Sequence, residues 1–357
     1  MADIVAKVNH AVSDPSVVQP WFETNRRKVG RWLRRREVGP LLGGLTGGLT
    51  DWNAYTSYLA WRGDERAVVR EINGSEMVLD PTMAGISQEL LMYGGREELS
   101  ASIFERELTQ LAQQVDSPVT VLEIGANIGY YALLEARVLG DDTRVLAFEP
   151  DPRNVDLLSR SIERNGYGDR IDVERVAVGD SDGTITFNIL PLSNKSHVAE
   201  ESFTRAHDVE RQIDVPQKTV STILDERDVA ADEINVVRMD VEGYEAQVFQ
   251  GMSDVLDSEQ PLVLFFELHR SRLDDDRFEW MLDTLAESGL EIVAVTDLVG
   301  PMWYETQLPW SSFDELREID EDHSIHLILR RTPNEESTDS RRLTAQRLSA
   351  VRETLFP

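Results

Sequence analysis

Residues 119–129 read VTVLEIGANIG, and this stretch decides the fold. Its first six residues are apolar or β-branched apart from Glu123, which is typical of a strand buried on both faces of a parallel sheet. Gly125 and Gly129 follow the strand and precede an apolar helical pattern, so the chain turns tightly from strand to helix. The segment predicts the first strand, loop and helix of an α/β domain whose ligand lies at the carboxyl ends of the strands.

Further strands and helices alternate after this segment, as in a doubly wound sheet with helices on both faces. Asp151 and Pro152 are the start signals of the helix that follows the second strand, and Gly166 is its end signal. We therefore expect a Rossmann-like, mostly parallel sheet of seven strands. The remaining six strands are expected at 144–149, 171–178, 234–240, 261–269, 290–297 and 324–331.

The 357 residues exceed the usual size of one domain, so regions flanking the sheet are expected. Asn73-Gly74, between two apolar runs of residues 67–80, is a strong hairpin signal. Helical periodicity follows over 86–92 and 100–114. Four regions result: residues 1–66 with helical patterns and a basic segment, the hairpin and lead-in helices of 67–116, the main domain of 117–332, and a polar linker with a final helix over 333–357.

Acidic residues dominate the composition, with 65 Asp and Glu against 36 Lys and Arg, so the formal net charge is −29 at pH 7. Such a surface repels nucleic acid. It also keeps a protein hydrated in concentrated salt, where screening removes most of the self-repulsion. We therefore expect a halophilic source, and a nucleic-acid partner is disfavoured.

The absence of cysteine excludes disulfides, zinc–thiolate sites and thiolate nucleophiles. No uncharged apolar run reaches the roughly 18 residues that span a bilayer. The pair Arg26-Arg27 resembles a twin-arginine leader, but more basic residues interrupt the next stretch and no A-x-A site follows. We expect a cytoplasmic protein. The basic segment from Arg26 to Arg36 is expected to be a solvated helix face paired with nearby acids, with peripheral contact to an anionic membrane surface at the inner face as the alternative.

Carboxylates follow the expected strands at the edge where a nucleoside ligand would lie. Glu149 is placed to accept hydrogen bonds from ribose hydroxyls, which NAD and S-adenosylmethionine share. A pyrophosphate, however, needs a third glycine and free amides, whereas this loop has Asn127 and is preceded by Glu123. Together with Asp240 and Glu242 these carboxylates form an anionic rim. The rim favours S-adenosylmethionine, which carries a sulfonium and an ammonium and no phosphate.

Four blocks of the main domain resemble the FkbM-family methyltransferases: residues 122–136 (LEIGANIGYYALLEA), 146–166, 238–252 (RMDVEGYEAQVFQGM) and 264–269 (LFFELH). The resemblance implies a class I methyltransferase fold and O-methylation of a hydroxyl on a sugar, glycan, glycolipid or natural product. It implies that the cofactor is held by the two strand-end motifs, Glu123, Gly125, Ala126, Asn127, Gly129, Glu149 and Pro150, with Asp240, Glu242 and Gly243 bordering the methyl group.

Methyl transfer to a hydroxyl needs a base near the sulfonium. His269 is the first candidate, because it ends the fifth strand and its reference pKa of about 6.5 suits proton transfer. Asp240 is the second, and a purely structural role is the alternative for both. We expect no metal ion, because the polar strand-end residues lack a dedicated ligand spacing. Candidate acceptor contacts are Tyr130, Glu267, and Asn194, Lys195 and His197 of the polar insertion 191–212, which either covers the acceptor or is a surface loop.

Three other functions remain open at this point. A nucleic-acid methyltransferase shares the fold. No D-P-P-Y or N-P-P-Y motif for amino-group methylation is present, so within this class methylation of an RNA ribose remains open. An NAD-dependent oxidoreductase is disfavoured by the chemistry of the glycine loop. The third is a protein that binds S-adenosylmethionine without catalysis. Titration with S-adenosylhomocysteine and with NADH separates these functions.

Overall fold

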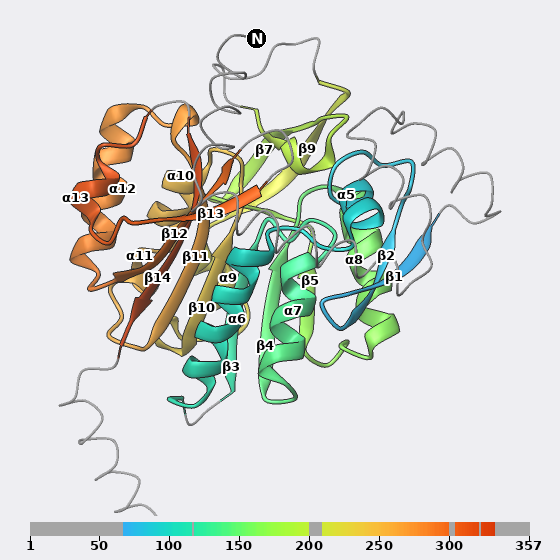
Figure 1. Cartoon of the computed structure of the whole chain (residues 1–357), viewed down its shortest axis with the longest axis horizontal. Helices are drawn as coiled ribbons and strands as arrows, with labels where there is room; N and C mark the ends of the chain where they lie inside the picture. The colour runs from blue at the N-terminus through green and yellow to red at the C-terminus, as the bar shows by residue number, and fades with distance from the viewer. Residues whose placement is uncertain (1–66, 116–117, 200–208, 300–303, 321–322, 333–357) are drawn as a thin grey trace, which may run out of the picture.

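The computed structural model describes residues 67–115, 118–199, 209–299, 304–320 and 323–332. Its central sheet has eight strands in the order β13-β12-β14-β11-β10-β3-β4-β5 (Figure 1). These strands are β3 (Val119–Ile124), β4 (Thr143–Phe148), β5 (Ile171–Glu174), β10 (Ile234–Met239), β11 (Leu262–His269), β12 (Glu291–Val299), β13 (Tyr304–Leu308) and β14 (Ser324–Arg331).

Neighbouring strands from β5 to β11 are parallel, while β14 runs antiparallel to both β11 and β12. The chain winds outward from β3 to β4 and β5 and then crosses back to β10 and β11. The winding therefore reverses between β3 and β10, at the switch point where open α/β sheets bind ligands. The mostly parallel, doubly wound sheet predicted from the sequence is confirmed, and β13 adds an edge strand to the seven expected.

Helices cover both faces of the central sheet, because successive side chains of a strand point to opposite faces. In β3, Val121 belongs to the hydrophobic core that includes residues of α6, α7 and α8, whereas Leu122 belongs to the core that includes residues of α9, α10 and α12. The predicted caps of α8 are confirmed: the Asp151 carboxylate accepts from the Arg153 N–H, and Gly166 ends the helix. The helices are α6 (Glu98–Ala112), α7 (Tyr130–Leu139), α8 (Pro152–Asn165), α9 (Val220–Asp225), α10 (Glu245–Gly251), α11 (Ser253–Leu256) and α12 (Asp275–Glu287).

The predicted hairpin is present as β1 (Val68–Ile72) and β2 (Ser75–Leu79), with Asn73 and Gly74 at the turn in left-handed conformations. It packs on α8, where the Ser161 hydroxyl accepts from the Val78 N–H at 2.9 Å. The lead-in helices are α5 (Ile86–Tyr93) and α6. Side chains of this region share one hydrophobic core with β3 and α7, so the lead-in completes the main domain.

A second sheet lies next to the central one and corrects the prediction of one strand over 171–178. That stretch divides into β5 of the central sheet and β6 (Ala177–Val178), which pairs with β9 (Arg211–Lys218). The small sheet has the order β6-β9-β7-β8, with β7 (Gly183–Ile189) and β8 (His197–Val198). Part of the predicted polar insertion 191–212 is thus strand.

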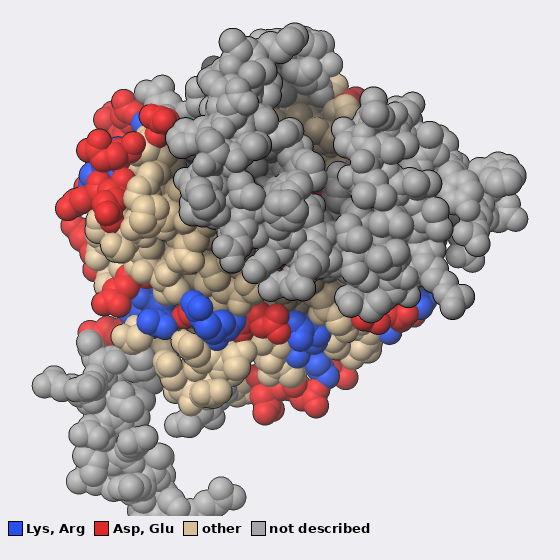
Figure 2. Space-filling view, in the orientation of Figure 1, with Lys and Arg blue, Asp and Glu red and all other residues tan. Residues whose placement is uncertain are grey.

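Acidic side chains gather on the surface over α12 and α13 (Phe313–Leu316), as Figure 2 shows. The carboxylates of this surface are in contact with water, which hydrates their negative charge. No helix within the described part of the chain is long and apolar enough to cross a membrane. The predictions for residues 1–66, including the segment Arg26 to Arg36, and for 333–357 fall on residues outside those described.

Candidate active site

The glycine loop between β3 and α7 depends on two glycines for different reasons. Gly125 has φ +76°, and a Cβ there would lie 2.1 Å from the carbonyl oxygen of Asp240. Gly129 has φ +88°, and a Cβ there would lie 2.3 Å from Cδ1 of Leu158 on α8. Gly125 therefore lets the loop pass against the end of β10, and Gly129 lets α7 pack on α8.

Glu149, directly after β4, joins the two motifs predicted to hold the cofactor. Its Oε2 accepts from the Asn127 N–H at 2.8 Å, and its Oε1 accepts from the Asp151 N–H at 2.9 Å and the Asn154 amide at 3.1 Å. Burial raises the pKa of Glu149 to about 7, although these hydrogen bonds oppose the shift. The carboxylate is thus held in place mainly by backbone amides.

A cavity that is open to solvent lies at the switch point between β3 and β10. One wall comes from the strand ends of the central sheet and another from the small sheet. Its lining residues are Ile124, Gly125, Asn127, Phe148, Glu149, Pro150, Asn154, Val176, Ala177, Val178, Phe187, Ser193, Asn194, Ser196, Val198, Asp240, Val241, Glu242 and Tyr244.

The cavity contains six of the residues predicted to hold the cofactor, namely Gly125, Asn127, Glu149, Pro150, Asp240 and Glu242. Glu123, Ala126, Gly129 and Gly243 are not among its lining residues.

The structure corrects the prediction that Glu123 belongs to the anionic rim. Glu123 is fully buried on the face of β3 that packs under α7, and its Oε1 accepts from Arg238 at 3.1 Å. Burial raises its pKa to about 7, with Arg238 opposing the shift. Arg238 also lies 3.4 Å from the Asp240 carboxylate and stacks 4.3 Å from the Tyr131 ring centre. The rim that faces the cavity therefore consists of Glu149, Asp240 and Glu242.

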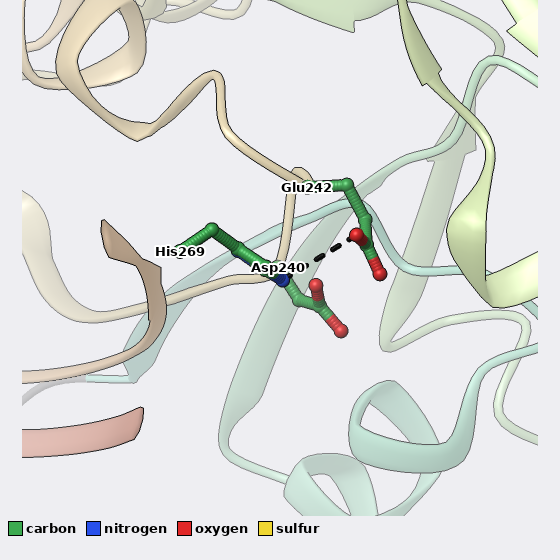
Figure 3. A group of neighbouring side chains, drawn as sticks. All are labelled: Asp240, Glu242 and His269. Carbon is green, nitrogen blue, oxygen red and sulfur yellow. Dashed lines mark ion pairs between the residues drawn. The ribbon is translucent and has the colours of Figure 1, made fainter. Parts of the chain in front are cut away.

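Asp240, Glu242 and His269 come together where β10 and β11 end (Figure 3). His269 is the last residue of β11, and its Nε2 lies 3.4 Å from Glu242 and 3.3 Å from Glu267. Its Nδ1 lies 2.7 Å from Oε1 of Glu245, which is 24 positions away on α10. His269 is only 2% exposed and does not line the cavity. The imidazole is thus enclosed by carboxylates.

The charges in this cluster shift one another's pKa values. Burial alone would lower the pKa of His269, but Glu267, Glu242 and Glu245 outweigh it and raise that pKa well above its usual range. Burial likewise would raise the pKa of Glu267, but His269 and His326 hold it well below its usual range. For Glu242 burial dominates and raises the pKa.

Two cations hold Glu242 from the other side. Lys195 Nζ lies 3.3 Å from Oε1 of Glu242, and Arg272 Nη2 lies 2.9 Å from Oε2. Arg272 Nη1 also donates to the backbone oxygen of Glu242 at 2.6 Å. A Cβ at Gly243 would lie 2.6 Å from Cδ of Arg272, so this glycine makes room for the arginine.

Comparison with known proteins assigns the domain that contains this site. A model of the methyltransferase FkbM domain matches residues 123–323. The chain belongs to the FkbM methyltransferase family. This result confirms the family predicted from the sequence. It also confirms the predicted fold class and the enzyme class, which is a methyltransferase that depends on S-adenosylmethionine.

Individual relatives are more distant. The hexuronic acid methyltransferase AglP of Haloferax volcanii is 29% identical over 153 residues, which are 42% of this chain and 56% of AglP. The methyltransferase sdnD of Sordaria araneosa is 25% identical over 206 residues, 50% of this chain and 79% of sdnD. The crystal structure of a methyltransferase FkbM from Methylobacillus flagellatus is 14% identical, covers 68% of this chain and 65% of that one, and aligns with a TM-score of 0.36. The chain thus matches little more than half the length of AglP.

The acceptor contacts predicted for this FkbM domain divide between the cavity and the interior. Asn194 lines the cavity. Lys195 is not among the lining residues, but it pairs with Glu242, which is. His197 is buried, with Nδ1 2.7 Å from the Lys195 backbone oxygen, and burial lowers its pKa. The Tyr130 hydroxyl donates to the Arg96 backbone oxygen, and Glu267 pairs with His269 and His326, so neither Tyr130 nor Glu267 lines the cavity.

Sequence reasoning missed the wall that the small sheet gives to the FkbM site. Phe187 of β7, Val198 of β8 and Tyr244 after β10 line the cavity, as does Asn154 of α8. The alternating pattern of residues 183–189 (GTITFNI) is a strand signal that could have indicated β7. Nothing local marks Asn154, whose position follows from α8 beginning beside Glu149.

Proposed function

We propose that this chain transfers a methyl group from S-adenosylmethionine to a hydroxyl oxygen of a sugar or a sugar-bearing acceptor. The observation that carries the proposal is the charge of the cavity. Glu149, Asp240 and Glu242 line it, and its described lining residues include no lysine or arginine. Such a lining suits a cationic donor and opposes the pyrophosphate of NAD.

The residues present fit this donor. Glu149 keeps lone pairs for ribose hydroxyls after accepting its three hydrogen bonds. Asn154 Oδ1 and Asp240 Oδ1 are buried without a hydrogen-bond partner, and both residues line the cavity. Buried acceptors without partners are costly, so a ligand that donates to them is stabilised. Apolar side chains such as Phe187 offer a surface for the base.

When bound, the donor supplies an electrophilic methyl group on a sulfonium. The chain must then align the acceptor oxygen and remove its proton. We assign the proton to Asp240 Oδ1, because this atom is unpartnered and its residue faces the cavity. His269, the first candidate from the sequence, lies behind Glu242, so we assign it a positioning role through that carboxylate.

A sugar acceptor is supported by two observations. AglP is named as a hexuronic acid methyltransferase, and its similarity to this chain supports a carbohydrate. Ser193, Asn194 and Ser196 line the cavity with hydroxyl and amide groups, which suit hydrogen bonding to sugar hydroxyls. The other acceptor class of the family, a natural-product hydroxyl, is the alternative for the same reaction.

Two measurements test the proposal. Calorimetric titration should show that the full chain binds S-adenosylhomocysteine and does not bind NADH, in molar salt suited to its acidic surface. With isotope-labelled methyl donor and a panel of uronic acids and neutral sugars, Asp240→Asn should lower kcat by about 10²- to 10⁴-fold, as for loss of a general base. Asp314→Asn, which removes a highly exposed carboxylate of α13, is the control. Failure to bind S-adenosylhomocysteine would refute the proposal.

A further inference from the structure

Three polar atoms, each shielded from solvent, meet beside the cavity: Oδ1 of Asp240, Oε2 of Glu242 and Nε2 of His269. Asp240 Oδ1 has no hydrogen-bond partner, whereas Glu242 Oε2 pairs with Arg272 at 2.9 Å and His269 Nε2 lies 3.3 Å from Glu267. One atom from each of these residues lies within 4.8 Å of the others. Native proteins rarely leave a buried polar atom unpaired, so Asp240 Oδ1, which lies beside the other two atoms, indicates a missing ligand.

We propose that Asp240, Glu242 and His269 bind one divalent metal ion. Asp240 Oδ1, assigned above as the proton acceptor of the ion-free site, would be a ligand when the ion is bound. The imidazole is oriented for this role, because Nδ1–H donates to Glu245 at 2.7 Å and Nε2 faces Glu242 at 3.4 Å. An ion would replace the proton on Nε2. A carboxylate that fixes the far nitrogen is the usual partner of a metal-binding histidine. Glu245 is itself fixed by the Gly243 N–H at 2.9 Å.

Size and charge are compatible with an ion. Metal bonds to nitrogen and oxygen ligands are about 2.0–2.2 Å long, so two opposite ligands lie about 4.2 Å apart. The separation of up to 4.8 Å closes if the side chains move by a few tenths of an ångström. Lys195 and Arg272 keep Glu242 in place, and Glu267 adds a further carboxylate 3.3 Å from His269. One nitrogen and two carboxylate oxygens suit Mn²⁺ or Fe²⁺ better than Ca²⁺.

The position of the ion bears on the methyl acceptor. Asp240 and Glu242 line the cavity, whereas His269 stands behind them, so an ion on these three residues presents its open coordination positions to the cavity. The ligand class that fits those positions is an oxygen-bearing acceptor such as a sugar hydroxyl. This last inference rests on the proposed function, but ion binding itself does not. The sequence prediction was that no metal ion binds, because these strand-end residues lack a dedicated ligand spacing. The proposal departs from that prediction because their side chains converge where β10 and β11 end.

Mn²⁺ binding to the full chain, without methyl donor or acceptor, tests the site. Electron paramagnetic resonance measures free Mn²⁺ during titration in molar KCl, which screens weak binding to the many surface carboxylates. We expect one saturable Mn²⁺ per chain, and pulsed measurements should detect coupling to the ¹⁴N of His269. Affinity should fall more than 100-fold in His269→Ala and in Asp240→Asn, and 10- to 100-fold in Glu245→Gln, which removes only the orienting carboxylate.

Two controls make the outcome decisive. Asp314→Asn should bind Mn²⁺ as the unmodified chain does, and circular dichroism should show that the variants are folded. Asp240→Asn preserves size and remains informative if His269→Ala does not fold. Mn²⁺ binding that is equal in all variants, or that lacks ¹⁴N coupling, would overturn the proposal. His269 Nε2 would then carry a proton that faces the carboxylates, and no metal ion would bind there. The proposed methyl transfer would then still stand or fall on binding of S-adenosylhomocysteine.

Discussion

The two ends of the cavity are built by different means. At the β3–β4 end, the glycine loop and Glu149 are held by backbone amides, and Gly125 allows backbone to touch backbone. At the β10–β11 end, the contacts are between charged side chains that come from separate elements, such as Glu242 with Lys195 and His269 with Glu245. Backbone contacts fix shape, whereas charged contacts depend on partners and on pH, so the two ends should respond differently to substitution.

The largest effect is expected for Gly125→Ala at the backbone-built end. The new Cβ would lie 2.1 Å from the Asp240 oxygen, in addition to the strain of φ +76°. The free energy of unfolding should fall by about 4 kcal/mol, about 1–2 from the backbone strain and the rest from overlap. Gly166→Ala is the control for backbone strain alone, because its φ is +67° and nothing lies within 4 Å of its Cβ. Urea unfolding of both variants measures the difference, and equal losses would contradict it.

Arg238→Met should have the next largest effect, because it leaves Glu123 buried without a counterion. Breaking a buried ion pair costs about 3–5 kcal/mol, and we expect about 3, because Glu123, with a pKa of about 7, can take up a proton. Adding Glu123→Gln should recover part of the loss. Urea unfolding measures both variants. If the free energy of unfolding of Arg238→Met alone lies within about 1 kcal/mol of that of the unmodified chain, the Arg238–Glu123 pair does not stabilise the fold.

A smaller effect is expected from the pH dependence of Glu149. Its pKa of about 7 means that the carboxylate becomes ionised as the pH rises from 6 to 8, so affinity for S-adenosylhomocysteine should rise about tenfold over that interval. Glu149→Gln should remove this dependence. The stability of the ligand-free chain should change in the opposite direction. Because the pKa of Glu149 is higher in the folded chain, the free energy of unfolding falls as the pH rises from about 4.5 through about 7. Calorimetry at several pH values tests binding, and an unchanged profile in the variant would contradict the assignment.

The smallest effect is expected for Lys195→Met at the charged end. The Lys195 side chain is 37% exposed, and a partly exposed ion pair contributes less than about 1 kcal/mol. Arg272→Met should cost more, about 1–3 kcal/mol, because Arg272 also donates to the Glu242 backbone oxygen. Thermal unfolding of the two variants ranks them. A larger loss for Lys195→Met would reverse our view of which cation holds Glu242.

Local signals predicted the backbone-built end well. The strand–glycine–helix segment, the N-cap at Asp151 and the position of Glu149 were all predicted from residues close to one another in the chain. The charged end was predicted less completely. Asp240 and Glu242 were expected at the cavity, but the contacts of His269 with Glu245 and of Glu242 with Arg272 join separate elements.

The error at Glu123 has a structural reason. Adjacent residues of a strand point to opposite faces, so Glu123 shares the face of Val121 under α7, while Ile124 shares the face that reaches the cavity. In the register of β3 with β10, Glu123 lies opposite Arg238, which forms the cross-strand pair. An arginine inside the apolar run of 234–239 was a signal that a buried carboxylate lies nearby.

The sequence by itself determined the doubly wound α/β sheet, the family and the strand-end motifs, because apolar periodicity, caps and glycine positions act over a few residues. Only the tertiary structure decided which carboxylates face the cavity, that the small sheet supplies a wall, and that Asp240, Glu242 and His269 share one point. Those outcomes depend on strand register and on contacts between distant segments, and neither is encoded in any short stretch of residues.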